Sequence, residues 1–86
     1  MKQETIAIRL RDGWDATPAA MLVQVASKFE SRIYMQSEDG TVKVNAKSIM
    51  GMMSLGLNEG VNVVVSAEGS DEEAAVASIR EYLSNN

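Results

Sequence analysis

The chain has 86 residues, 45% of them hydrophobic and 23% charged, a composition that fits one small globular domain rather than a disordered or fibrous chain. It contains no cysteine and no histidine, which excludes disulfides, thiol catalysis, imidazole acid–base chemistry, phosphohistidine and most zinc sites. A net charge of −4 argues against direct nucleic-acid binding, because phosphates repel an acidic surface. With no run of about 20 apolar residues and no secretory leader, we expect a single cytoplasmic domain over residues 1–86 and no membrane association.

The first elements predicted along the chain are a strand and a helix. Residues 6–11 alternate between large apolar and other side chains, which predicts a strand with one buried face that ends at Asp12-Gly13. A helix follows, with Asp15 as its N-cap and Pro18 in its first turn, where backbone N–H groups have no helical partner. The spacing of one apolar stripe predicts its core-facing side: Leu22, Val25, Ala26 and Phe29.

A hairpin is predicted next. Residues 32–36 and 41–44 have strand character and are joined around Glu38-Asp39-Gly40, in which Asp-Gly is a strong turn signal. The side chains expected to share one buried face are Ile33, Met35, Val42 and Val44.

A short helix after Ser48 has apolar residues on two opposite sides. At about 100° per residue, Met52 and Leu55 lie on one face, and the residues on the other are Ile49, Met50 and Met53. We expect the first face to enter the core and the second to remain exposed as a contact surface for a partner. The alternative is that both faces are buried, which periodicity alone does not exclude.

The last elements predicted are a strand and a long helix. After the turn Asn58-Glu59-Gly60, β-branched residues alternate over 61–67, as in a half-buried strand. In the final helix, Ser70 and Glu73 match a capping box, and the predicted buried side is Ala75, Val76, Ile79, Tyr82 and Leu83. The order β-α-β-β-α-β-α predicts an α+β open-faced sandwich, a four-stranded antiparallel sheet covered on one face by three helices.

Two segments resemble a known family. Residues 13–20 read Gly-Trp-Asp-Ala-Thr-Pro-Ala-Ala, and residues 45–51 read Asn-Ala-Lys-Ser-Ile-Met-Gly. Together with the element order, they resemble the HPr family, the small phosphocarrier proteins of the bacterial phosphoenolpyruvate-dependent sugar phosphotransferase system. The resemblance covers essentially the whole chain.

The phosphocarrier site of that family is altered. In the family pattern Gly-x-His-Ala-Arg-Pro-Ala, the histidine carries phosphate and the arginine helps to hold it. Asp15 stands at the histidine position and Thr17 at the arginine position. Because a carboxylate and a hydroxyl replace an imidazole and a planar cationic fork, the resemblance implies no ordinary phosphocarrier activity. An aspartyl phosphate on Asp15 is an alternative, although it usually needs Mg²⁺ and Asp12 is the only close acidic companion.

A second site of the family is retained at Ser48. In HPr proteins of many Gram-positive bacteria, an ATP-dependent kinase/phosphorylase modifies this serine, and the phosphoserine form is a corepressor for a catabolite-control transcription factor. Catabolite-repression HPr proteins lack the histidine but keep the serine, although they typically retain the arginine and carry glutamine in place of the histidine. The resemblance therefore implies a regulatory protein, without enzymatic activity, cofactor or metal. Its implied partners are this kinase and a transcription factor or metabolic enzyme.

The resemblance also implies where partners bind. The starts of the two helices are expected to lie side by side, so that a partner-binding face flanks Ser48 and Asp15. Its predicted members are Ala20, Gln24, Lys47, Ile49, Met50 and Met53. Two alternatives remain open: Ser48 serves only as a helix cap, or the protein is a binding module with neither phosphorylation.

Overall fold

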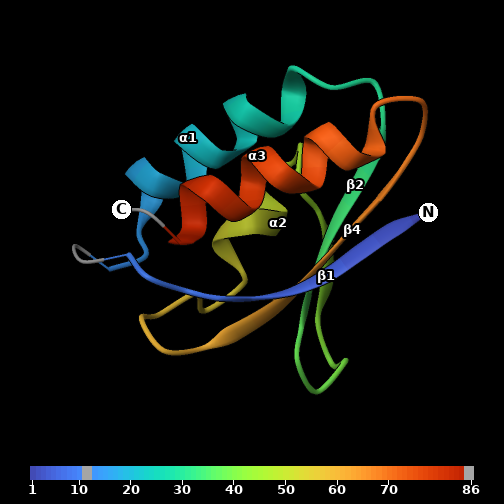
Figure 1. Cartoon of the computed structure of the whole chain (residues 1–86). Helices are drawn as coiled ribbons and strands as arrows, with labels where there is room; N and C mark the ends of the chain where they lie inside the picture. Colours follow the sequence, from blue (N-terminus) through green and yellow to red (C-terminus); the bar gives the residue numbers. More distant parts are fainter. Residues whose placement is uncertain (11–12, 85–86) are drawn as a thin grey trace.

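Within residues 1–10 and 13–84, which the computed structural model describes, the helices and strands follow in the predicted order (Figure 1). They are β1 (Lys2–Ala7), α1 (Ala16–Ser27), β2 (Arg32–Ser37), β3 (Lys43–Asn45), α2 (Ile49–Met53), β4 (Asn62–Glu68) and α3 (Glu72–Ser84). Arg11 and Asp12, predicted at the end of the first strand, lie outside the described residues. The helices cover one side of the sheet, which confirms the predicted α+β architecture.

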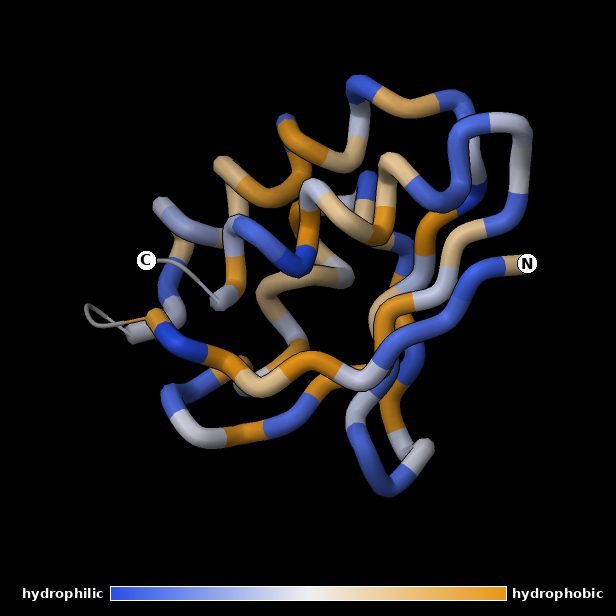
Figure 2. Tube along the Cα trace, in the orientation of Figure 1, coloured by the Kyte–Doolittle hydropathy of each residue, from blue (hydrophilic) through white to orange (hydrophobic). Residues whose placement is uncertain are grey.

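The sheet has the order β1-β4-β2-β3, and all neighbouring strands are antiparallel. In the register, Ile6 lies opposite Val63, and Met35 lies opposite Val65. Because side chains alternate along a strand, these apolar residues all point to the helical side, and the residues between them are less buried. Figure 2 shows the hydropathy along the chain. The predicted alternation continues past β1, since Ile8 is fully buried and its N–H donates to the Val61 carbonyl at 2.9 Å.

The core lies between the sheet and the two longer helices. Leu22 and Ala26 of α1 are buried as predicted. The residues predicted for the buried side of α3 are also buried, except Tyr82, which is half-buried: Ala75, Val76, Ile79 and Leu83. Phe29 packs against the core from beyond the end of α1, so the helix is shorter than the predicted stripe. Arg80 pairs with Glu4 at 2.9 Å and joins α3 to β1. Among residues 1–10 and 13–84, none of the helices has the length and apolar character needed to cross a bilayer.

The start of α3 differs from the prediction. The predicted exchange of hydrogen bonds between Ser70 and Glu73 is wrong. Instead, the Glu72 carboxylate accepts the N–H of Gly69 at 3.2 Å, so that both partners of this bond lie one residue before the predicted pair. The helix begins at Glu72, after a turn in which the Glu72 N–H donates to the Gly69 carbonyl at 3.3 Å. Only the carboxylate half of a capping box is present, because Gly69, with a φ of +156°, has no side chain that could accept an N–H of the helix.

Asp71, which directly precedes α3, binds the loop between α1 and β2. It accepts hydrogen bonds from the N–H of Glu30 at 2.9 Å, from the N–H of Ser31 at 3.0 Å, and from the Ser31 hydroxyl. These bonds, chiefly the one from the hydroxyl, hold the pKa of Asp71 below its usual value. Asp71 thus fastens one end of α3 to the beginning of β2.

Candidate functional site

Ser48 is the N-cap of α2, as predicted. Its backbone is extended, with φ −109° and ψ 113°, and its Oγ accepts the N–H of Gly51 at 3.3 Å. A Cβ added to Gly51 would lie 3.2 Å from the Val44 Cβ and 3.5 Å from the Ser48 Oγ. Glycine at this position therefore lets α2 lie close to β3 while leaving space around the half-buried Ser48 side chain.

Two hydrogen bonds from outside the helix fix the position of α2. With five residues, α2 is too short to be stable alone. At its start, the Lys47 ammonium donates to the Phe29 carbonyl at 2.6 Å. At its end, the Trp14 indole N–H donates to the Met52 carbonyl at 3.3 Å. Lys47, predicted in the partner-binding face, is half-buried and bound within the protein.

The same two bonds correct the predicted arrangement of the helices. Trp14 precedes α1 and reaches the end of α2, whereas Lys47 precedes α2 and reaches the residues just beyond α1. The prediction that the helix starts lie side by side is therefore wrong, because the start of each helix lies near the end of the other. Ser48 is associated with the end of α1, and Asp15 with the end of α2.

The two faces of α2 are distributed as predicted. Met52 is fully buried and Leu55 is 3% exposed, whereas Met50 is 79% exposed. Ile49 and Met53 are also exposed, so α2 presents an apolar surface, here called the α2 patch: Ile49, Met50 and Met53. Helical periodicity could predict this division because the two apolar sets lie on opposite sides of one short helix.

On α1, the predicted contact residues Ala20 and Gln24 are exposed, as is Met21, which was not predicted to lie at the surface. Met21 is 47% exposed. The signal that could have identified it is its position just outside the stripe that contains Leu22 and Ala26, since an apolar residue off that stripe cannot reach the core.

Asp15 has the structural role predicted for it. It is the N-cap of α1, and its Oδ1 accepts the N–H of Thr17 at 3.0 Å. Both side chains are exposed. Asp12, the acidic companion considered for an aspartyl phosphate, lies outside the described residues. In the described part of the chain, no three potential metal ligands gather into one group.

Comparison with known proteins places the chain in a family. A family model described as "PTS HPr component phosphorylation site" matches residues 2–85. The HPr-like protein Crh of Bacillus subtilis (strain 168) is 43% identical over 83 residues, which are 96% of this chain and 95% of that protein.

Two solved structures agree with this match. HPr-C-His from Thermoanaerobacter tengcongensis is 49% identical with a TM-score of 0.86, over 96% of this chain and 91% of that one. The solution structure of Crh, "the Bacillus subtilis Catabolite Repression HPr", is 40% identical with a TM-score of 0.69, over 99% of both chains. The chain therefore belongs to the HPr family of the phosphotransferase system.

Proposed function

We propose that this chain is a regulatory HPr-like protein of carbon catabolite control, phosphorylated at Ser48 and inactive as a histidine phosphocarrier. The observation that carries the proposal is the Ser48 cap next to the exposed α2 patch, in a chain without histidine. The similarity to Crh, a protein named for catabolite repression, supports the assignment to this pathway.

The local geometry of Ser48 supports its modification. Its Oγ already accepts an N–H from the first turn of α2, and phosphate oxygens are stronger acceptors of such bonds. The partly exposed side chain is next to Ile49 and Met50, which offer a kinase apolar contacts beside the hydroxyl. Phosphorylation should therefore change the charge beside the α2 patch with little change in fold.

The test is incubation of the full chain with an HPr-type serine kinase and ATP, followed by intact-mass measurement. We expect one added phosphate on the parent protein and none on Ser48→Ala. Ser54→Ala is the matched control, because Ser54 is an exposed serine just after α2 whose hydroxyl donates to the Gly51 carbonyl at 2.6 Å. Equal labelling of Ser48→Ala and the parent would contradict the proposal.

The proposed partner-binding face surrounds this serine. It combines the α2 patch with the exposed α1 residues Ala20 and Gln24, and Lys47 is left out of it because its ammonium is bound to the Phe29 carbonyl. The thioethers of Met50 and Met53 can adapt to differently shaped surfaces, which suits a protein that binds both a kinase and a transcription factor or metabolic enzyme.

A second experiment tests the loss of phosphocarrier activity. The enzyme that charges HPr from phosphoenolpyruvate should transfer no label to this chain, because Asp15 and Thr17 replace the histidine and arginine that the transfer requires. The double variant Asp15→His/Thr17→Arg is the positive comparison and should regain part of the transfer. Stoichiometric label on the parent would contradict the regulatory assignment, and hydroxylamine-labile label would favour an aspartyl phosphate.

A further inference from the structure

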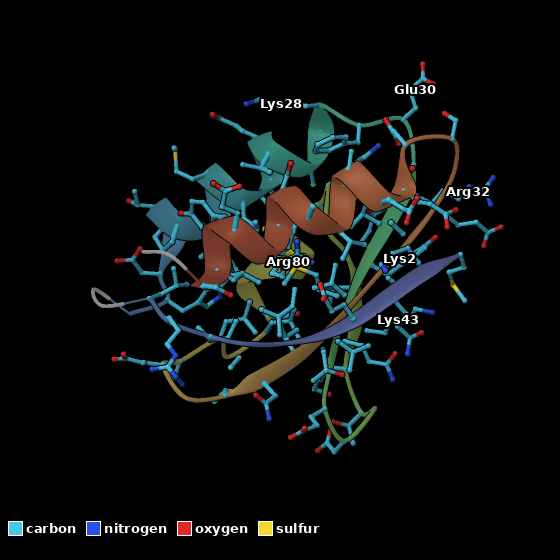
Figure 3. All side chains as sticks on the ribbon, viewed as in Figure 1. Lys2, Lys28, Glu30, Arg32, Lys43 and Arg80 are labelled. Carbon is cyan, nitrogen blue, oxygen red and sulfur yellow. The ribbon has the colours of Figure 1, made fainter. Side chains whose placement is uncertain are left out.

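The face of the sheet opposite the helices contains a small hollow. Its volume is about 230 Å³, and it is formed where β2, β3 and β4 run side by side. The polar side chains that line it, here called the sheet pocket, are Arg32, Tyr34, Lys43, Ser66 and Glu68. In Figure 3, Arg32 and Lys43 lie on the right of the view, with the helices to the left.

The strand register brings these residues together. Tyr34 lies opposite Ser66, and Arg32 lies opposite Glu68. Since Arg32 and Tyr34 are two residues apart on one strand, their side chains emerge on the same face. Lys43 reaches over from β3, with its Nζ 4.9 Å from the centre of the Tyr34 ring. This cation–π contact holds the ammonium at the pocket.

The sheet pocket has a positive charge that the protein does not neutralise. Within the described residues, the ion pairs are Met1–Glu72 and Arg80–Glu4. Met1 also lines the hollow, but its ammonium is paired with Glu72, and neither ion pair involves Arg32 or Lys43. Arg32 and Lys43 therefore face a single carboxylate, Glu68, although the whole chain has a net charge of −4. Two cations gathered against the overall charge of the protein make an attractive site for an anion.

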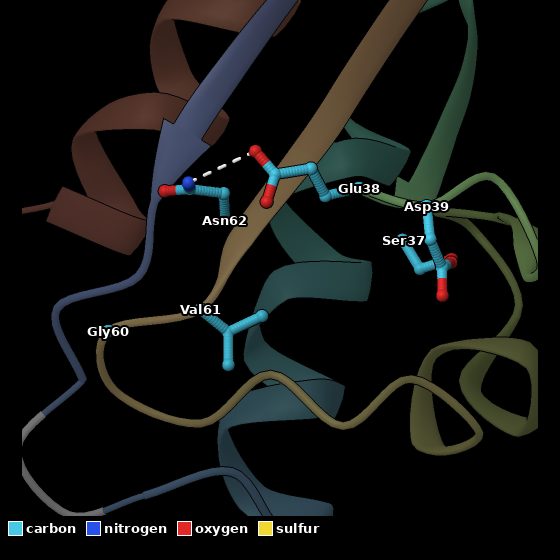
Figure 4. Close-up of a pocket in the computed structure, with 6 residues that line it drawn as sticks. All are labelled: Ser37, Glu38, Asp39, Gly60, Val61 and Asn62. Carbon is cyan, nitrogen blue, oxygen red and sulfur yellow. Dashed lines mark hydrogen bonds between the residues drawn. The ribbon is translucent and has the colours of Figure 1, made fainter.

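Another hollow, which has a larger volume, lacks these properties. It is lined by Ser37, Glu38, Asp39, Gly60, Val61 and Asn62, with a volume of about 490 Å³ (Figure 4). Its carboxylates already have partners: Glu38 accepts from the Asn62 amide at 3.1 Å, and Asp39 accepts from two neighbouring hydroxyls and a backbone N–H. The backbone bond from Thr41, followed by the hydroxyl bonds, lowers the pKa of Asp39 to about 2.

We propose that the sheet pocket binds a small phosphate monoester that also carries a hydroxyl group. The guanidinium of Arg32 offers two parallel N–H groups to phosphate oxygens, and Lys43 adds a second positive charge. Ser66 can donate to the ligand, and Glu68 accepts from its hydroxyl group. The volume of about 230 Å³ is below the range of about 300–1,000 Å³ typical of drug-sized ligands, so the occupant is small.

Titration followed by ¹H–¹⁵N NMR tests the proposal with the full chain. Glycerol 3-phosphate should produce saturable shifts at Arg32, Tyr34, Lys43 and Ser66, and should bind more tightly than inorganic phosphate at matched ionic strength. Non-saturable shifts, or equal affinity for inorganic phosphate, would overturn the assignment. Tight binding of an acidic peptide, without any spectral change on addition of glycerol 3-phosphate, would also overturn the assignment.

Variants locate the binding. Arg32→Gln should weaken it about tenfold or more, because a charge-assisted bidentate contact is lost, while leaving the melting temperature unchanged at this exposed position. Lys28→Gln removes an equal charge at the end of α1 and should have no effect (Figure 3). Equal affinity in Arg32→Gln and the parent would refute the proposal. Ser48→Ala should bind like the parent, so this test is independent of the proposed phosphorylation.

Discussion

The opposite faces of α2 give a sharp test of how the site is built. Met52 is fully buried, whereas Met50, two residues earlier, is 79% exposed. Truncating a buried methionine to alanine removes the transfer free energy of its side chain and leaves a cavity, which together cost about 2–5 kcal/mol. The same truncation at an exposed position changes the free energy of unfolding by about 0.5 kcal/mol or less.

The expected difference is large relative to the stability of the domain. The free energy of unfolding of a small domain is about 5–15 kcal/mol. In domains of about 60–100 residues, a loss of 1 kcal/mol of this free energy lowers the melting temperature by about 4–8 °C. Met52→Ala should therefore lower the melting temperature by about 8 °C or more, and Met50→Ala should leave it nearly unchanged. Far-UV circular dichroism during heating measures the melting temperature of both variants, and urea denaturation measures their free energy of unfolding.

The glutamate variants connect stability to recognition. Met50→Glu should preserve the melting temperature and weaken phosphorylation by the kinase, because it places a charge in the exposed α2 patch. Met52→Glu should destabilise the fold strongly, because it buries a carboxylate without a partner. A large loss of stability in Met50→Glu together with a neutral Met52→Glu would show that Met50, and not Met52, faces the core.

Two further predictions concern the junction between α3 and β2. Gly69→Ala should destabilise the protein by about 2 kcal/mol or more, because the backbone has a φ of +156° and the added Cβ would lie 2.7 Å from the Ser31 Cα. Gly56→Ala is the matched control for urea denaturation, since its Cβ would meet its nearest neighbour at 3.9 Å. Folding lowers the pKa of Asp71 below its unfolded value of 3.8. The ionised carboxylate therefore stabilises the native state at pH values above 3.8, and this stabilisation is lost as the pH falls through the pKa of the folded protein. Asp71→Asn should be less stable than the parent at neutral pH, and the difference in their free energies of unfolding, measured by urea denaturation, should become smaller below pH 3.8. A difference in free energy that stays constant with pH would contradict this role of Asp71.

The elements of the fold could be predicted because each has a clear local pattern. The alternation at Ile6 and Ile8 and the cap at Asp15 are properties of a few neighbouring residues, and the structure confirms them. Where several local solutions compete, the sequence is ambiguous. Ser70 was a plausible cap, but the backbone at Gly69 and the contacts of Asp71 with another loop favour a different start for α3.

The site could be predicted only in part for the same reason. The cap at Ser48 and the two faces of α2 follow from periodicity within one helix. The orientation of α2 against α1 depends on Lys47 and Trp14, whose acceptors are carbonyls that any residue type supplies. No pattern of side-chain types marks such acceptors, so these contacts were not predicted.

The pairing of the first strand with the last one affects how the protein is made. In the register, Lys2 lies opposite Ala67 and Ala7 lies opposite Asn62, and β4 is the sole neighbour of β1 in the sheet of the described residues. During translation, β1 therefore leaves the ribosome long before the backbone groups that will bind it have been synthesised. Pairing between segments so distant in sequence raises the contact order and slows folding. We expect the sheet to close only after β4 has emerged, so that the domain folds as one unit late in synthesis rather than strand by strand.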